Sequence, residues 1–111
     1  MEIGATGQAA VRDVADRDRF EIDVDGAVAG FLQYRRRPGT IAFLHTEIDP
    51  EHEGEGLGGI LASAALVAAR REDLRVLPFC PFVRSYIERH PEYLDLVPAE
   101  RRAGFGLPVD G

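Results

Sequence analysis

The chain has 111 residues, 45% of them hydrophobic, which suits one domain with a packed core and argues against a disordered protein. Its net charge of −6 argues against a protein that wraps nucleic acid, and no apolar run approaches the roughly 18 residues that a membrane span requires. A single cysteine cannot form an internal disulfide, and the N-terminus lacks the basic and apolar regions of a secretion signal, so a reducing, cytoplasmic setting is expected.

The first half of the chain has the pattern of an antiparallel meander. Apolar and charged residues alternate over 19–24, which predicts a half-buried strand, and a weaker pattern near 8–14 suggests a strand before it. The Asp-Gly pair at 25–26 is a hairpin signal, so 27–35 is expected to return beside the first strand. Residues 40–48 are richer in apolar residues and are predicted to form a more central strand.

The second half alternates between helix and strand signals. Apolar residues recur on one helical face over 57–72, residues 74–79 read as a strand, and 81–90 begins with a proline at a first helical position. The order strand, helix, strand predicts that 40–48 and 74–79 are parallel neighbours joined by a right-handed crossover.

No repeat or linker divides the chain, so 1–111 is predicted to be a single domain. Its expected class is α/β (α+β), with a mixed, mostly antiparallel sheet, one parallel pair and flanking helices. Residues 98–111 are polar and rich in glycine and proline, which suggests a loosely held tail.

Four glycines crowd the start of the first predicted helix: Gly54, Gly56, Gly58 and Gly59. A helix N-terminus presents unpaired N–H groups and a partial positive charge, and glycine lets the backbone approach a ligand closely. The loop is therefore a candidate cradle for phosphate or pyrophosphate, and a plain glycine-rich turn is the alternative. All 13 basic residues are arginine, so the lysine of a Walker loop is missing, and the spacing G-x-G-x-G-G fits a dinucleotide fingerprint poorly.

This order of elements and this loop resemble the GNAT superfamily of acyl-CoA-dependent N-acetyltransferases. The loop pattern of that superfamily is Q/R-x-x-G-x-G/A; Gly56 and Gly58 match its small positions, and Glu53 departs from Gln/Arg. The sequences H-T-E at 45–47 and C-P-F-V-x-x-Y-I at 80–87 are similar to a short, single-domain branch of the superfamily.

The resemblance implies a GNAT-like acyl-CoA N-acyltransferase fold that binds acetyl-CoA, with the pantetheine arm between two splayed parallel strands. It implies transfer of an acetyl group to an amine, either a protein or a small amine, by a monomer or weak dimer without a metal. A non-catalytic or regulatory CoA-binding module is the alternative function. The cofactor-binding positions that it implies are Thr46, Ile48, Gly54, Glu55, Gly56, Leu57, Gly58, Gly59, Cys80 and Tyr86.

Cys80 directly precedes Pro81, at the predicted N-cap of the last helix. The helix dipole there favours a thiolate, which could accept the acetyl group and pass it on. Cys80 could also only line the acetyl pocket, or it could be a buried structural cysteine.

His45 and Glu47 lie on one face of the predicted strand 40–48, because they are two residues apart. Either could deprotonate an ammonium acceptor, and a neutral imidazole is the better base near pH 7. The alternatives are a core histidine and a solvated carboxylate. Thr46 is expected on the opposite face.

Tyr86 follows Cys80 by six residues on the last predicted helix. The superfamily often places a tyrosine here that protonates the departing CoA thiolate, although its usual position is that of Ile87; a packed aromatic side chain is the alternative. Candidates for binding the 3′-phosphate of CoA are three helix arginines, Arg70, Arg71 and Arg84, although exposed helix arginines are usually only solvated.

Overall fold

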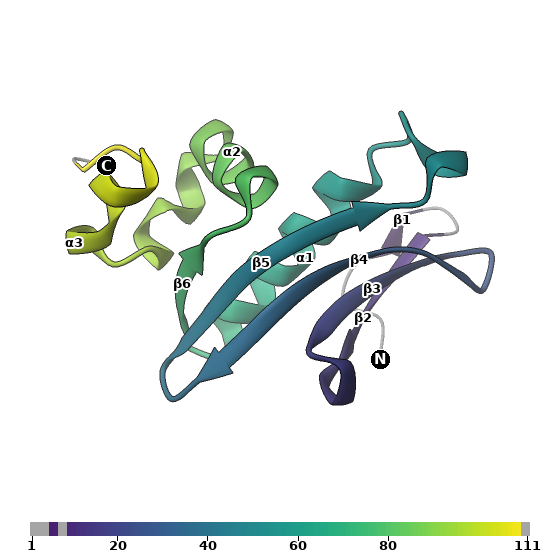
Figure 1. Cartoon of the computed structure of the whole chain (residues 1–111), viewed down its shortest axis with the longest axis horizontal. Helices are drawn as coiled ribbons and strands as arrows, with labels where there is room; N and C mark the ends of the chain where they lie inside the picture. The colour runs from purple at the N-terminus through teal and green to yellow at the C-terminus, as the bar shows by residue number, and fades with distance from the viewer. Residues whose placement is uncertain (1–4, 7–8, 110–111) are drawn as a thin grey trace.

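The fold is built around a six-stranded sheet whose strands follow one another in chain order (Figure 1). This computed structural model describes residues 5–6 and 9–109 of the chain. The strands are β1 (Ala5–Thr6), β2 (Ala9–Val14), β3 (Arg19–Val24), β4 (Ala27–Arg37), β5 (Thr40–Ile48) and β6 (Arg75–Pro78). Neighbouring strands are antiparallel except β5 and β6, so the predicted mixed sheet with one parallel pair is confirmed.

Helices pack against this sheet and at its β6 end. The α-helices are α1 (Leu57–Arg71), α2 (Pro81–Arg89) and α3 (Ala99–Arg102), and short 3₁₀ helices span Ala15–Arg17, Pro50–His52, Pro91–Leu96 and Ala103–Phe105. The crossover helix α1 contacts each strand from β2 to β6 and lies behind the sheet in Figure 1. None of the described helices is both long and apolar enough to cross a membrane.

The core lies between α1 and one face of the sheet, because the strands alternate in polarity. On β3, β4 and β5 the inward side chains are almost fully buried: Phe20, Ile22, Leu32, Tyr34, Ile41 and Phe43. The helix contributes leucines and alanines to the same core, and its small residues let the helix approach the sheet closely. The other face of the sheet carries charged side chains such as Glu47 and also the apolar side chain of Phe31.

The C-terminal segment packs more closely than its composition suggests. Leu107 is buried, its N–H donates to Arg102 O, and the ring of Phe105 lies edge-on to Phe79 with the centroids 5.2 Å apart. Arg102 Nε donates to the carbonyl of Val97. Residues 98–109 therefore form part of the packed molecule, in contrast to the expected loose tail. Residue 8 of the strand predicted near 8–14, and residues 110–111, lie outside the described residues.

Strands β5 and β6 part halfway along β5. Their pairing runs from Thr40–Arg75 to Phe43–Pro78, and the N–H of Cys80 then donates to Phe43 O at 2.8 Å. Strand β5 continues to Ile48, so in the described part of the chain residues 44–48 have a strand neighbour, β4, on one side only. We call this segment the open edge of β5. It begins beside the start of α2 and ends beside the start of α1.

Two bulges shape this end of the sheet. Gln33 pairs with His45 and Tyr34 with Phe43, which leaves Leu44 as an extra residue at the point where β5 and β6 part. The second bulge lies in β4, where Ala29 is extra relative to β3. Bulges bend a strand and re-aim its side chains, so they set which residues of β5 face outward.

Candidate functional site

The glycine loop forms a hollow at the N-terminus of α1. Gly54 and Gly56 have φ values of +84° and +76°, which are strained for any other residue, so the loop path depends on glycine there. Gly56 is the N-cap, and none of the described side chains caps the first turn of α1. The hollow has a volume of about 260 Å³ and is lined by the four glycines, by Ile48, His52, Glu53 and Leu57, and by Phe82 of α2.

This geometry suits an anionic group such as phosphate. The first N–H groups of a helix have no partner within the helix, and here none of the described side chains caps them, so they are available to an anion. The glycine Cα atoms of Gly54 and Gly56 face open space, since a Cβ built on either would meet nothing within 4 Å. A ligand can therefore approach the loop backbone closely.

Gly58 and Gly59 also serve the packing of α1 against α2. A Cβ on Gly58 would lie 2.7 Å from Phe82 Cζ, which is too close for real atoms. A Cβ on Gly59 would lie 3.8 Å from Tyr86 Cε2, an ordinary contact. Of the two, only Gly58 is close enough to Phe82 that a Cβ would force the partly exposed ring to shift, a contact that the sequence pattern does not reveal.

Cys80 and Thr46 meet where the two strands part. The Sγ of Cys80 lies 3.2 Å from the Oγ1 of Thr46, and Cys80 is the N-cap of α2 as predicted. Cys80 is only 2% exposed and packs with the core residues, which agrees with a pocket wall or a structural cysteine more than with an open nucleophile. The contact between Thr46 and Cys80 joins the open edge of β5 to the start of α2.

His45 and Glu47 lie together on the outer face of the sheet. Their side chains are 57% and 64% exposed, and His45 Nε2 is 3.5 Å from Glu47 Oε2. The ring of His45 lies edge-on to Phe31 at 6.1 Å, and Arg19 Cζ is 4.5 Å from the centroid of Phe31. The alternative of a core histidine is therefore wrong for His45. Successive side chains of a strand alternate between faces, so this pair points away from the face that carries Thr46.

Tyr86 is held by aromatic neighbours. Its ring stacks on His90 at 4.0 Å between centroids, and the ring of Tyr93 lies 6.1 Å away. His90 Nδ1 is also 2.9 Å from the carbonyl oxygen of Tyr86. The other side of the ring is near Gly59 of α1, so Tyr86 lies at the border of the loop region and within a packed aromatic group.

The structure does not support Arg70 and Arg71 as ligands of the 3′-phosphate. Both lie in the last turn of α1, and the 15-residue helix spans about 22 Å from the glycine loop at its other end. Arg70 also donates two hydrogen bonds to Asp95 and one to the carbonyl of Glu92. It therefore fastens the segment after α2 to α1.

His52 is a candidate site residue that was not predicted from the sequence. This side chain lines the hollow of the glycine loop, and its Nδ1 lies 3.0 Å from Glu55 Oε1. The hydrogen bond to Glu55 raises the pKa of His52 above its ordinary value. One feature of the sequence could have indicated it: His52 is the only basic residue in the stretch 49–59.

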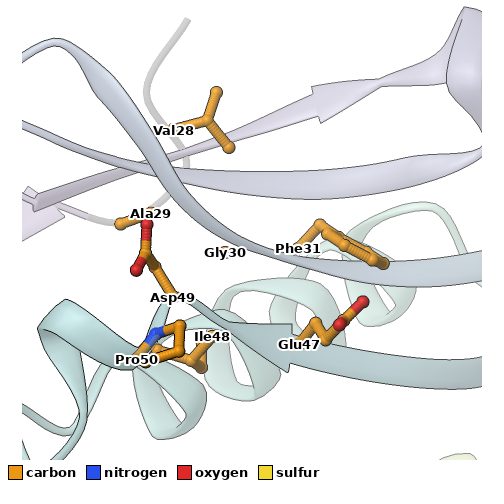
Figure 2. Close-up of a pocket in the computed structure, with 8 residues that line it drawn as sticks. All are labelled: Val28, Ala29, Gly30, Phe31, Glu47, Ile48, Asp49 and Pro50. Carbon is orange, nitrogen blue, oxygen red and sulfur yellow. The ribbon is translucent and has the colours of Figure 1, made fainter.

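A second hollow lies where β4 begins and β5 ends, beside Glu47 (Figure 2). It has a volume of about 340 Å³ and is lined by residues 28–31 of β4 and 47–50 at the end of β5. Figure 2 shows the side chains of Phe31 and Glu47 on neighbouring strands, with Val28 apart from them and Asp49 close to Ala29. The hollow thus combines apolar walls with two carboxylates.

Comparison with known proteins identifies the family. Residues 19–96 match the family model of the GCN5-related N-acetyl-transferase, and no curated protein matches the chain. Among solved structures, a Staphylococcus aureus protein described as a GCN5-like N-acetyltransferase is similar, with a TM-score of 0.63 and 23% identity over 84% of this chain and 91% of the other.

A ribosomal-protein-alanine N-acetyltransferase from Brucella melitensis biovar Abortus 2308 also matches, with a TM-score of 0.47 and 18% identity over 84% of this chain and 64% of that protein. The family match covers most of the chain, including both strands that part and the loop between them. The chain therefore belongs to the GCN5-related N-acetyltransferase family.

Proposed function

We propose that the protein is an acetyl-CoA-dependent N-acetyltransferase that moves an acetyl group to an amine acceptor. The observation that supports this best is the parting of β5 and β6 beside the glycine-rich N-terminus of α1. The open edge of β5 offers backbone groups to a pantetheine arm, and the uncapped first turn of α1 offers N–H groups to a pyrophosphate.

The glycine loop, the Thr46–Cys80 pair and the His45–Glu47 pair each take one role in this proposal. When bound, acetyl-CoA supplies an acyl group activated as a thioester. The backbone of Gly54–Gly59 holds the pyrophosphate, and Thr46 and Cys80 line the acetyl pocket where β5 and β6 part. His45 or Glu47 accepts the proton that an acceptor ammonium must lose before it attacks.

The acceptor approaches from the outer face in this proposal. His45 and Glu47 are exposed there, and the hollow of Figure 2 lies beside Glu47. Carboxylates of Glu47 and Asp49 attract an ammonium group, while Val28 and Phe31 suit an apolar body next to it. A primary amine with an apolar portion fits this surface best.

The direct test is turnover of acetyl-CoA with a panel of amines. Release of the CoA thiol is measured with spermidine, a lysine-containing peptide and phenethylamine, each against its N-acetylated form as a control. Background from acetylated lysine side chains of the enzyme is absent, because the chain has no lysine. An amine that accelerates thiol release supports the proposal. Binding of CoA without turnover of any amine supports the non-catalytic CoA-binding alternative instead.

A further inference from the structure

The loop that would receive the cofactor is rich in carboxylates. Residues 49–59 contain Asp49, Glu51, Glu53 and Glu55, and they contain no arginine. Glu53 also occupies the position where the resembling superfamily has Gln or Arg. Phosphate groups are anionic, so these side chains oppose cofactor binding. The partial positive charge at the start of α1 acts against four carboxylates.

Among the described residues that line the hollow, His52 has the only basic side chain. Its Nδ1 lies 3.0 Å from Glu55 Oε1, and Nδ1 is the donor because an ionised carboxylate only accepts. Nε2 is then the ring atom left for another partner, and it donates a hydrogen only when the ring is protonated. The side chain is 26% exposed, so it is held in the loop and is still accessible to a ligand.

The charges around His52 favour its protonated form. The hydrogen bond to Glu55 raises the pKa of His52 most, burial is the next largest influence and lowers it, and the charges of Glu55, Asp49 and Glu51 raise it by smaller amounts. The remaining lining residues on other elements are uncharged: Ile48 of β5, Leu57 and the glycines at the start of α1, and Phe82 of α2. The fourth carboxylate of the loop, Glu53, lines the same hollow and acts in the same direction as the others.

We propose that the imidazolium form of His52 is a cofactor-binding group, which donates from Nε2 to the pyrophosphate of acetyl-CoA and supplies the cation that the loop otherwise lacks. This inference rests on the proposed function, since it needs the glycine loop to hold the cofactor. A histidine that is already paired with Glu55 contributes a cation to the loop without the long, flexible side chain of an arginine.

The consequence is a proton linked to cofactor binding. A phosphate next to His52 stabilises the imidazolium, so the complex holds this proton to a higher pH than the free protein does. Affinity is therefore full below the pKa of His52 in the free protein and falls as the pH rises through it. A charge-assisted hydrogen bond of ordinary strength predicts a loss of roughly tenfold in affinity across this range.

The test is calorimetric titration of the whole chain between about pH 5.5 and about pH 8.5, the range in which histidine titrates. Dephospho-CoA is the decisive probe, because the 3′-phosphate of CoA is a monoester with its own pKa near 6 and would add a second titration. Repeating the titrations in buffers of different ionisation enthalpy gives the number of protons taken up on binding.

Three variants isolate His52. His52→Gln should bind dephospho-CoA equally at all pH values, with the affinity that the wild type has at high pH. His52→Arg should keep high affinity at high pH, because arginine stays charged. His45→Gln is the matched control: it removes a histidine from the exposed outer face, and the pH dependence should remain. Circular dichroism checks that each variant is folded.

The outcomes separate this inference from the proposed function. Affinity for dephospho-CoA that falls with pH in the wild type but not in His52→Gln supports the role of His52. Binding that is independent of pH, or that keeps its pH dependence in His52→Gln, overturns that role and leaves the proposed function standing. Absence of binding by both CoA and dephospho-CoA at every pH overturns the proposed function and this inference with it.

Discussion

At the scale of single residues, the candidate chemistry divides between the two faces of β5. Thr46 and Cys80 are in contact at the point where β5 and β6 part, while His45 and Glu47 are exposed on the outer face. An amine arriving from solvent meets His45 and Glu47 first, and Cys80 is only 2% exposed. This arrangement favours direct attack of the amine on the thioester over a route through an acetyl-cysteine.

Substitutions at the two faces should therefore have unequal effects. Cys80→Ala should keep kcat within about threefold, because the thiol only lines the pocket, whereas a double variant His45→Gln/Glu47→Gln should lose about 100-fold in kcat, the low end for a general base. Steady-state kinetics with an amine that the wild type accepts measures both. A collapse of kcat in Cys80→Ala with CoA affinity unchanged would instead establish an acetyl-cysteine.

Gly56 tests the phosphate cradle, with Gly39 as a matched control. Both residues have a left-handed backbone, with φ of +76° and +77°, and both have open space around the Cα atom. Valine at either position should reduce the free energy of unfolding by a similar amount, about 1–2 kcal/mol, measured by urea denaturation. Only Gly56→Val should also lose CoA affinity, by roughly tenfold or more, because only Gly56 borders the hollow. Equal CoA affinities of Gly56→Val and Gly39→Val would contradict the proposal that the glycine loop binds phosphate.

At the scale of elements, a long and regular hydrophobic pattern predicts where a helix or strand lies. A local irregularity such as a bulge leaves no such pattern and is not predicted. Strand β5, predicted from its apolar residues, has the predicted bounds, and α1, whose apolar residues recur with period 3.6, ends one residue before its predicted end. Strand β1 contains only two residues, too few for any pattern. The bulges at Leu44 and Ala29 shift the register by one residue without changing composition, so the sequence does not reveal them.

The candidate site was predictable to a similar degree. The glycines and Cys80 stand out in the sequence because their residue types are unusual at a helix start. The glycine loop and the N-cap of α2 lie where the sequence pattern predicts them. His52 was missed because a histidine among carboxylates in a loop is typical of a solvated surface. Its contact with Glu55 depends on the 3₁₀ turn Pro50–His52 and on the path of the glycines, neither of which follows from periodicity.

The contact between β4 and β5 depends on Gly30. A Cβ at this position would lie 2.6 Å from both Glu47 O and Ile48 Cδ1. Gly30→Ala should therefore cost about 1–3 kcal/mol in unfolding free energy and displace the end of β5, which carries Glu47 and borders both hollows. Gly104→Ala is the control, because a Cβ there meets nothing and should change stability by less than about 0.5 kcal/mol. If Gly30→Ala and Gly104→Ala unfold at the same midpoint temperature, the proposed steric requirement for Gly30 is wrong.

At the scale of the whole molecule, the negative net charge of the protein repels the phosphate groups of the proposed ligand. The net charge is −6, and the carboxylates at 49–55 place part of it beside the glycine loop. The arginine Arg70 is paired with Asp95 at the far end of α1, so it does not offset this local charge. A protein that binds phosphates through lysines and arginines attracts them over a distance, whereas this loop relies on backbone N–H groups and, in our proposal, on His52.

The sign of the salt effect tests this view of the molecule. At a pH above the pKa of His52, where the ring is neutral, raising the salt from about 20 mM to about 200 mM should leave CoA affinity unchanged or raise it by about twofold, because salt screens the repulsion between carboxylates and phosphates. Glu53→Arg is the informative variant: it restores the residue type of the resembling superfamily, so affinity should rise at low salt and fall as salt is added. Titration calorimetry at several salt concentrations measures both proteins. A wild-type affinity that falls several-fold with salt would mean that arginines of the chain reach the bound phosphates, and the backbone cradle would then be secondary.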